Sequence, residues 1–241
     1  MAVASNPRAP ARVVFQVPLW QRFFSGFGYA LCGALAAFML AVAAYALVRG
    51  WFGMAALLSF TGSFQWLLAR YVGRDFRGKR GLRVELAPDQ LVLALPAGRS
   101  LIHRPPALHT ALPYAEIAAI ETRLEGYRTL GMAMVQRAYA LRRTSGELVF
   151  LFEDRAIGSG LESSFCGPIV AAILERARAP LRELGMVEGK GGLLGVWGTE
   201  AVAWHTPGLD AAGRARIWHA VQVTGWLLSA TLLTLWALSF F

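Results

Sequence analysis

The sequence predicts an integral membrane protein with three transmembrane helices, a hairpin plus a C-terminal helix, and an α+β domain between the second and third helices. Three observations predict this class. Residues 23–48, 51–69 and 220–241 are apolar runs without a charged side chain. The stretch between the last two runs shows strand patterns separated by turn residues, and the basic residues gather near the ends of the runs.

Each apolar run is long enough to cross a bilayer as a helix. The runs hold 26, 19 and 22 residues, and a helix needs about 20 apolar residues to span a hydrocarbon core about 30 Å thick. The first run is longer than the apolar part of a cleavable signal peptide, so we expect it to be retained. We assign the hairpin to residues 23–69 (spans 23–48 and 51–69) and the third span to residues 218–241.

Composition and charge agree with a membrane protein. Charged residues make up 16% of the chain, against about 25% in soluble domains. The net charge of +9 would suit nucleic acid, but its placement at the span ends predicts no such partner. The 24 basic residues comprise 22 arginines and 2 lysines, a bias that with the high alanine content suggests a GC-rich bacterial genome, so we expect a bacterial inner-membrane protein. By the positive-inside rule we expect its N-terminus and central domain to be cytoplasmic and its C-terminus to lie on the outer side.

The sequence holds no pattern typical of a catalytic, cofactor or metal site. The histidines lack metal-ligand spacing, and Cys32 and Cys166, one in a span and one in the domain, form no Cys-x-x-Cys pair. The nearest acid–base candidates are His103 in a Pro-containing loop and the adjacent Glu153 and Asp154. We interpret these as polar residues of a loop and a strand end, and we expect no cofactor.

The cytoplasmic parts follow in order. Residues 1–22 predict an arm that could lie at the membrane interface, and residues 70–188 predict the domain. Within the domain, residues 82–86 and 91–95 alternate with period two and predict a hairpin. A long loop at 96–109 follows.

The second half of the domain begins at residues 112–121, which predict a helical turn or a strand start leading into a strand near residues 120–124. Residues 135–143 and 148–153 predict a second hairpin whose turn uses Gly146 at positive φ.

An amphipathic helix is expected after these strands. Pro168 suits a first helical position. Apolar residues then recur every four positions; they are Ile169, Ile173, Ala177 and Leu181. We expect Pro180 to kink this helix and Gly185 to end it.

Residues 82–184 combine these hairpins, the Leu-Pro-Tyr-Ala-Glu-Ile-Ala-Ala-Ile-Glu segment at 112–121 and a final amphipathic helix. This order resembles the bacterial pleckstrin-homology-like (PH-like) domains of small membrane proteins. The resemblance implies an antiparallel half-barrel of about seven strands capped by a C-terminal helix, and no single activity. The long 96–109 loop and the third span depart from that family.

Residues 189–217 are glycine-rich and connect the domain to the third span. They hold Trp197 and Trp204, which would share a face if the segment were helical. Two interpretations stay open, a plain linker and a segment lying at the membrane interface.

Small residues at four-residue spacing predict close packing of the spans. They serve either the hairpin itself or a contact with a membrane protein partner or a second copy. No charged residue lies within a span, which argues against an ion-coupled transporter. The helix-packing candidates are Gly26, Ala30, Gly33, Ala37, Ser59, Gly225 and Ser229.

Basic residues after the second span have two interpretations, which are compatible. They set the topology, or they bind anionic lipid headgroups at roughly 1 kcal/mol each. The headgroup candidates, including two from the 96–109 loop, are Arg70, Arg74, Arg77, Lys79, Arg80, Arg83, Arg99 and Arg104.

Our leading functional hypothesis is a non-enzymatic adaptor, scaffold or assembly factor for a membrane protein complex. The alternative is a sensor of anionic membrane lipids. A third hypothesis, an enzyme acting on a membrane substrate through His103 or Glu153 and Asp154, has less support in the sequence.

Overall fold

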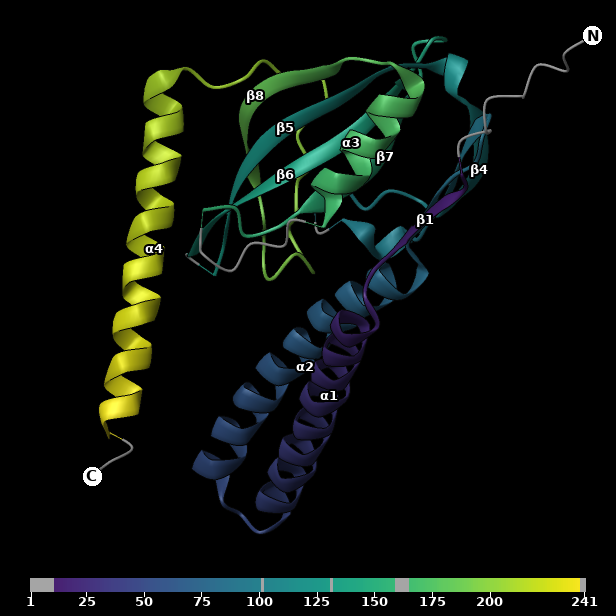
Figure 1. Ribbon diagram of the computed structural model, residues 1–241. Coiled ribbons are helices and arrows are strands. Elements are labelled where there is room, and N and C mark those ends of the chain that lie inside the picture. The colour runs from purple at the N-terminus through teal and green to yellow at the C-terminus, as the bar shows by residue number, and fades with distance from the viewer. Residues whose placement is uncertain (1–10, 101, 131, 159–164, 239–241) are drawn as a thin grey trace, which may run out of the picture.

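The computed structural model describes residues 11–100, 102–130, 132–158 and 165–238. Three of its helices are long and apolar enough to cross a membrane: α1 (Leu19–Val48), α2 (Phe52–Gly81) and α4 (Ala211–Leu238). Helices α1 and α2 form a hairpin, and α4 stands to one side of it (Figure 1). These three helices are compatible with a multi-pass membrane protein, and the chain also carries a sheet-rich domain.

Helix α2 continues well beyond the apolar run that predicted it. The run ends at Ala69, but the helix reaches Gly81. Arginine and lysine are good helix formers, and no proline interrupts residues 70–81, so the helix ends only where Leu82 turns to extended backbone. The first part of the predicted domain, residues 70–81, is thus a helical stalk that rises from the hairpin.

Two four-stranded sheets form the domain. The first is fully antiparallel and has the order β1 (Val13–Gln16), β2 (Arg83–Leu86), β3 (Gln90–Leu95) and β4 (Leu108–Pro113). The second has the order β7 (Leu148–Asp154), β6 (Met132–Arg143), β5 (Ile117–Thr129) and β8 (Leu181–Lys190). Short 3-10 turns, η1 (Ala97–Arg99) and η2 (Tyr114–Glu116), precede β4 and β5.

The predicted hairpins are confirmed. Strands β2 and β3 pair in antiparallel register, as do β6 and β7. Gly146 has φ +88° in the β6–β7 turn. Of the two interpretations of residues 112–121, the structure has the helical turn, at residues 114–116 before β5. The N-terminal arm differs from expectation, because Val13–Gln16 pairs with β2 as an edge strand.

The predicted helix over residues 168–185 is wrong in its second half. Helix α3 spans Cys166–Ala177 and ends at Arg178, which adopts left-handed backbone with φ 50°. Pro180 cannot continue a helix, and its carbonyl instead accepts a hydrogen bond from Ile120 N–H at 3.1 Å. Leu181–Lys190 then forms β8, which runs parallel to β5. The second sheet is therefore mixed, and the expectation of a purely antiparallel domain is also wrong.

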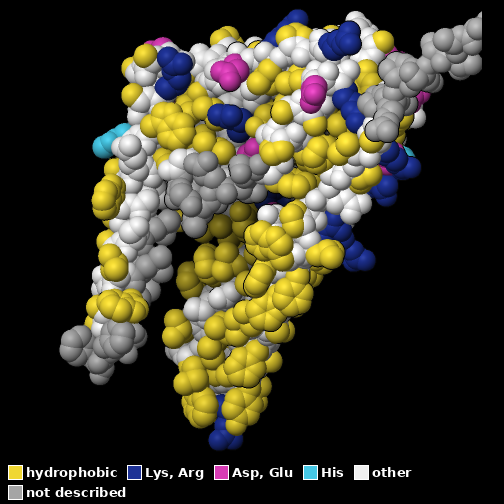
Figure 2. Space-filling model, viewed as in Figure 1, with side chains coloured by type: hydrophobic (Ala, Val, Ile, Leu, Met, Phe, Trp, Pro, Cys, Tyr) yellow, Lys and Arg dark blue, Asp and Glu magenta, His cyan; other side chains and the backbone are white. Residues whose placement is uncertain are grey.

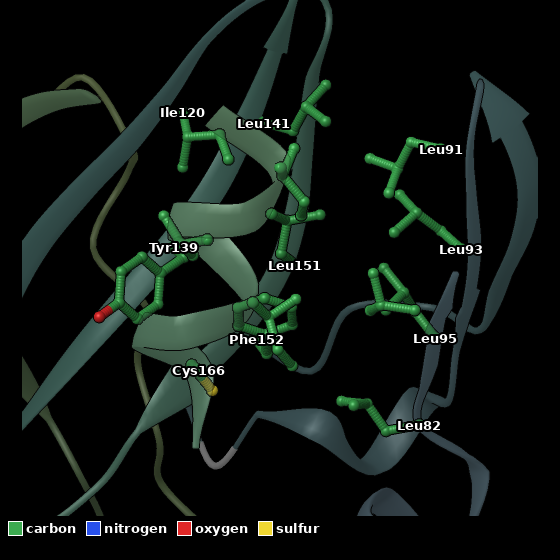
Figure 3. Packing of buried hydrophobic residues seen from close by; sticks show 14 of the residues in the cluster. Leu82, Leu91, Leu93, Leu95, Ile120, Tyr139, Leu141, Leu151, Phe152 and Cys166 are labelled. Atoms are coloured by element: carbon green, nitrogen blue, oxygen red, sulfur yellow. The ribbon is translucent and has the colours of Figure 1, made fainter. Parts of the chain in front are cut away.

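The main core lies between the sheets and under α3. Figure 3 shows Leu91, Leu93 and Leu95 of β3 pointing toward Leu141 and Leu151 of the second sheet. Helix α3 adds Ile169, Val170 and Ile173, all buried. Burial of each such side chain stabilises the fold by about 1.5–3 kcal/mol, which explains why the sheets face each other here.

Helix α4 uses its first half to pack on the second sheet. Ile217 and Val221 are buried against Ala133, Val135 and Met186. A Cβ on Gly126 would lie 2.7 Å from Ile217, so a glycine is needed for this contact. The predicted third span thus begins on the sheet, and the half of α4 beyond it stands clear of the hairpin (Figure 1).

Candidate functional site

The helical hairpin meets the sheet domain at a cluster of ion pairs, which we call the junction cluster (Ser25, Asp75, Lys79, Glu153 and Arg155). Arg155, just after β7, donates a 2.9 Å hydrogen bond to Asp75 Oδ1 of α2 and a 2.7 Å bond to Glu153 Oε1. Burial alone would lower the pKa of Arg155, but Glu153 and Asp75 raise it above its ordinary value. Arg155 is therefore a charged link between helix and sheet.

The second carboxylate oxygen of Asp75 bonds to the other helix of the hairpin, α1. Lys79 Nζ lies 2.7 Å from Asp75 Oδ2, and the Ser25 hydroxyl of α1 donates to the same oxygen at 2.8 Å. Lys79 also donates to Ser25 Oγ at 3.0 Å. One carboxylate thus joins α1, α2 and the second sheet.

A cavity of about 260 Å³ adjoins the junction cluster. Its lining includes Gln21, Tyr71, Lys79, Phe152 and Cys166. Burial raises the pKa of the Cys166 thiol well above its ordinary value, so it stays protonated and is a poor nucleophile. Because the carboxylates beside the cavity already accept hydrogen bonds from cations, this arrangement is suited to holding the hairpin in place rather than to proton transfer.

Backbone contact reinforces the junction. A Cβ on Gly78 of α2 would lie 2.6 Å from the Gly98 carbonyl oxygen, so α2 and the η1 turn touch through two glycines. Arg74 Nη1 donates to the Gly195 carbonyl at 2.7 Å, and Arg104 Nη2 donates to the Val196 carbonyl at 2.7 Å. The α2 stalk therefore contacts the η1 turn through Gly78 and the Gly195 carbonyl through Arg74, while Arg104 of the 96–109 loop holds the neighbouring Val196 carbonyl.

Arg99 links the two sheets from inside the domain. It is only 6% exposed. Its guanidinium donates to the carbonyls of Pro96 (2.8 Å), Pro106 (2.6 Å) and Phe150 (3.0 Å). Burial lowers the pKa of Arg99 to about 10. This predicted headgroup ligand is instead a structural residue.

The hydrogen bonds continue from the junction cluster into the second sheet. Ser100 Oγ donates to Glu153 Oε2 at 2.6 Å and accepts from the His103 N–H at 3.0 Å. His103 Nε2 lies 2.7 Å from Glu125 Oε1, an oxygen that also accepts from Arg123 Nε at 2.7 Å. Burial alone would raise the pKa of Glu125, but bonding to His103 and the charges of His103 and Arg123 hold it below its usual value.

Trp204 closes the far end of this network. The Arg123 guanidinium lies 4.4 Å from the centroid of the Trp204 ring. Trp204 Nε1 donates to Glu121 Oε2 at 2.7 Å, and Glu121 pairs with Arg142 at 2.9 Å. Sequence reasoning missed this network. Its signal was present, because Glu121, Arg123 and Glu125 alternate along one strand and so share one face.

The structure divides the predicted headgroup residues into two groups. Arg74, Lys79, Arg83, Arg99 and Arg104 all bond within the protein, Arg83 through Glu85 at 3.2 Å. Arg70, Arg77 and Arg80 are exposed on α2. The Arg70 guanidinium lies 4.9 Å from the centroid of the Trp66 ring. Arg83 and Arg104 are exposed as well, but their guanidinium groups bond to Glu85 and to the Val196 carbonyl.

The predicted helix-packing residues also divide. A Cβ on Gly26 would lie 2.9 Å from the Phe76 ring, so Gly26 does allow close approach of α1 and α2. Gly33 has no atom within 4 Å of its Cβ position, and neither has Gly225. Ala30, Ala37, Ser59 and Ser229 are exposed. The small residues that the two helices bury form a different series, which includes Ala36, Ala43, Ala46, Ala55, Gly62 and Gly73.

Trp197 and Trp204 lie in different surroundings. The segment between β8 and α4 is not helical, so they share no helix face. Trp204 is buried against the second sheet, whereas Trp197 is 53% exposed and contacts Trp66 of α2.

The described residues contain no group of three or more histidine, cysteine, aspartate or glutamate side chains placed to hold a metal ion. Comparison with known proteins finds no matching family model, no matching curated protein and no matching solved structure.

Proposed function

We propose that this chain is a non-enzymatic, multi-pass protein of the bacterial inner membrane that acts as an adaptor, scaffold or assembly factor for a membrane protein complex. In this proposal the sheet domain is PH-like and cytoplasmic. Two sheets packed around a common core with one amphipathic helix support a PH-like domain. The parallel strand β8 and the edge strand β1, which precedes the first span, are additions to the family pattern.

The placement of α4 carries the adaptor proposal. Figure 2 shows apolar side chains covering the hairpin below the sheet domain, and an open space between that hairpin and the lower half of α4. Trp226, Leu227 and Leu233 of α4 are each more than 60% exposed. Lipid tails are as apolar as leucine, so a bilayer accepts these side chains, and a face that no helix of this chain covers is open to a partner's transmembrane helix.

The junction cluster supports a scaffold in a second way. Ion pairs and the Gly78–Gly98 contact hold the domain at a set position on the hairpin. A membrane partner that binds the hairpin and also contacts the sheet domain would then find these two parts at a fixed relative position. The non-enzymatic part of the proposal is supported by the candidates for chemistry, because His103, Glu153 and Asp154 each bond to neighbouring protein groups.

Photo-crosslinking in intact bacterial membranes tests the adaptor proposal. A photoreactive amino acid replaces Ala37 of α1 or Ser229 of α4, both exposed. A matched control replaces Ala36, which is buried in the hairpin. We expect the two exposed positions to crosslink to the same membrane protein and the control to crosslink within the chain. Crosslinks to lipid alone at both exposed positions would contradict the proposal.

Anionic-lipid sensing remains a second candidate because Arg70, Arg77 and Arg80 are exposed together near the end of the apolar run. The full chain in vesicles would then enrich anionic lipid around itself, and replacing all three arginines by glutamine would abolish that enrichment. Equal enrichment in the triple variant would rule this candidate out.

A further inference from the structure

A tight loop at residues 191–198 directly follows β8 and lies beside α2. Its backbone closes on itself through Leu193 N–H to the Trp197 carbonyl at 2.8 Å and Gly195 N–H to the Gly191 carbonyl at 3.0 Å. Leu194 has φ 51°, and Gly192, Gly195 and Gly198 also have positive φ. The loop is thus a built structure that needs its glycines, and not a plain linker.

The domain and the stalk hold this loop firmly. The Thr129 hydroxyl donates to the Gly192 carbonyl at 3.0 Å and accepts from Leu194 N–H at 2.8 Å. Arg74 and Arg104 donate to carbonyls on its other side, at Gly195 and Val196. Leu194 is buried, yet the next large side chain, Trp197, is 53% exposed. The loop therefore presents the Trp197 ring at its surface.

Trp197 lies at the level where α2 changes from apolar to basic. Its ring centroid is 6.1 Å from that of Trp66, which belongs to the apolar run 51–69. Arg70, one turn further along α2, lies over the Trp66 ring at 4.9 Å. The order along this side of the molecule is apolar span, tryptophan pair, then arginines. That order matches the lipid interface, where tryptophan is enriched and cationic side chains meet the headgroups.

We propose that the 191–198 loop is a membrane-interface anchor, in which Trp197 inserts at the boundary between headgroups and acyl chains next to α2. The occupant of its exposed face is the lipid bilayer, because the face continues the lipid-facing surface of α2 at Trp66. Amphipathic indole rings favour this boundary. Arg74 and Arg104 satisfy loop carbonyls that would otherwise be costly to place near lipid. The inference rests on membrane insertion of α2, which belongs to the proposed function.

Site-specific labelling of the full chain in lipid nanodiscs tests this anchor. A Cys32→Ala chain carries one added cysteine labelled with an environment-sensitive fluorophore, at Trp197→Cys, Ser59→Cys or Ser145→Cys. Ser59 is exposed on the apolar half of α2, and Ser145 is exposed in the β6–β7 turn. The parent chain without an added cysteine measures any labelling of the buried Cys166.

We expect the Trp197→Cys label to emit at shorter wavelength than the Ser145→Cys label. Its emission should be quenched more by lipids with a nitroxide near the carbonyl end of the acyl chain than by lipids with one near the methyl end. A Trp197→Cys label that behaves like the Ser145→Cys label, while the Ser59→Cys label is quenched, overturns the anchor and leaves membrane insertion intact. A Ser59→Cys label that is also unquenched overturns membrane insertion itself.

A milder variant guards against misfolding of the cysteine chain. Trp197→Phe keeps an aromatic ring, and brominated lipids quench tryptophans at the membrane interface. We expect Trp197→Phe to lose part of the quenchable tryptophan emission of the native chain. An unchanged quenchable fraction overturns the anchor. If Trp197 is shielded from solvent in native membranes but not in nanodiscs, the anchor is also overturned, because a protein partner and not lipid then covers this face.

Discussion

Arg155 and Asp75 lie 80 positions apart in the chain, yet the guanidinium of one donates to the carboxylate of the other at 2.9 Å. This bond joins the end of β7 to α2, so it connects the sheet domain to the helical hairpin. Each partner has further bonds, from Arg155 to Glu153 and from Lys79 and Ser25 to Asp75. The pair is thus the centre of the junction cluster.

Removing the charge of Arg155 should loosen the junction. Arg155→Met leaves two carboxylates facing each other with one cation fewer, and breaking such a largely buried pair costs about 3 kcal/mol. We expect a lower midpoint of thermal unfolding. Near-ultraviolet circular dichroism of the protein in detergent measures this midpoint. Arg83→Met is the matched control. Its pair with Glu85 is more exposed and should contribute less than about 1 kcal/mol. Equal shifts for the two variants would contradict the central role of Arg155.

Gly78→Ala tests the backbone contact between α2 and η1. Alanine is favoured over glycine inside a helix by about 1 kcal/mol, but here its Cβ would lie 2.6 Å from the Gly98 carbonyl oxygen. We expect Gly78→Ala to destabilise the chain despite the gain in helix propensity. Gly167→Ala in α3, where the Cβ would meet no atom within 4 Å, should be neutral or stabilising. Unfolding midpoints of both variants decide this, and a stabilised Gly78→Ala chain would show that the contact is not tight.

Leucine substitutions separate the packing of the hairpin from contacts with a partner. Gly33→Leu and Gly225→Leu place side chains where no atom lies within 4 Å, whereas a Cβ on Gly62 would lie 3.0 Å from Leu40. We expect the first two variants to keep the native unfolding midpoint and to recover less of any co-purifying membrane protein. Gly62→Leu should lower the midpoint. Unchanged partner recovery in both Gly33→Leu and Gly225→Leu would count against these faces as contact sites.

Acid should weaken the network around Glu125. Its pKa in the folded protein lies below the unfolded value of about 4.3. A carboxylate with a lowered folded pKa stabilises the fold above the unfolded pKa, and this contribution is lost as pH falls through the folded pKa. We therefore expect part of the stability to disappear below about pH 4.3. Thermal unfolding of native chain and Glu125→Gln across this range measures the difference, and an equally steep acid loss in Glu125→Gln would exclude Glu125 as its source.

Most strands could be predicted from the sequence, because the pattern of apolar residues and turns is local. The β2–β3 and β6–β7 hairpins follow from period-two alternation and from turn residues such as Gly146. Strand β8 could not be predicted this way. Its residues continue the four-residue spacing of α3, and only Pro180 signals that the helix has ended. Parallel pairing with β5 is a long-range contact that no local pattern encodes.

The candidate site was harder to predict than the fold. Basic residues near a span suggest lipid contact, but whether an arginine faces lipid or a carbonyl depends on what the fold places beside it. Arg74 and Arg99 bond to carbonyls from β7, the 96–109 loop and the 191–198 loop. The small residues of α1 posed the same problem, because the hairpin selects the face that carries Ala36 and Ala43 over the equally regular face that carries Gly33 and Ala37.

The sequence by itself determined the three apolar helices, the two hairpins and the absence of a local metal or catalytic motif. These features depend on composition and short-range periodicity, because the spacing of apolar residues and the positions of turn residues specify helices and strands locally. Only the tertiary structure decided that Asp75 pairs with Arg155, that Trp204 is buried while Trp197 is exposed, and that α4 divides its length between the sheet and open space. Each of these depends on groups brought together from distant parts of the chain, so it follows from packing rather than from local pattern.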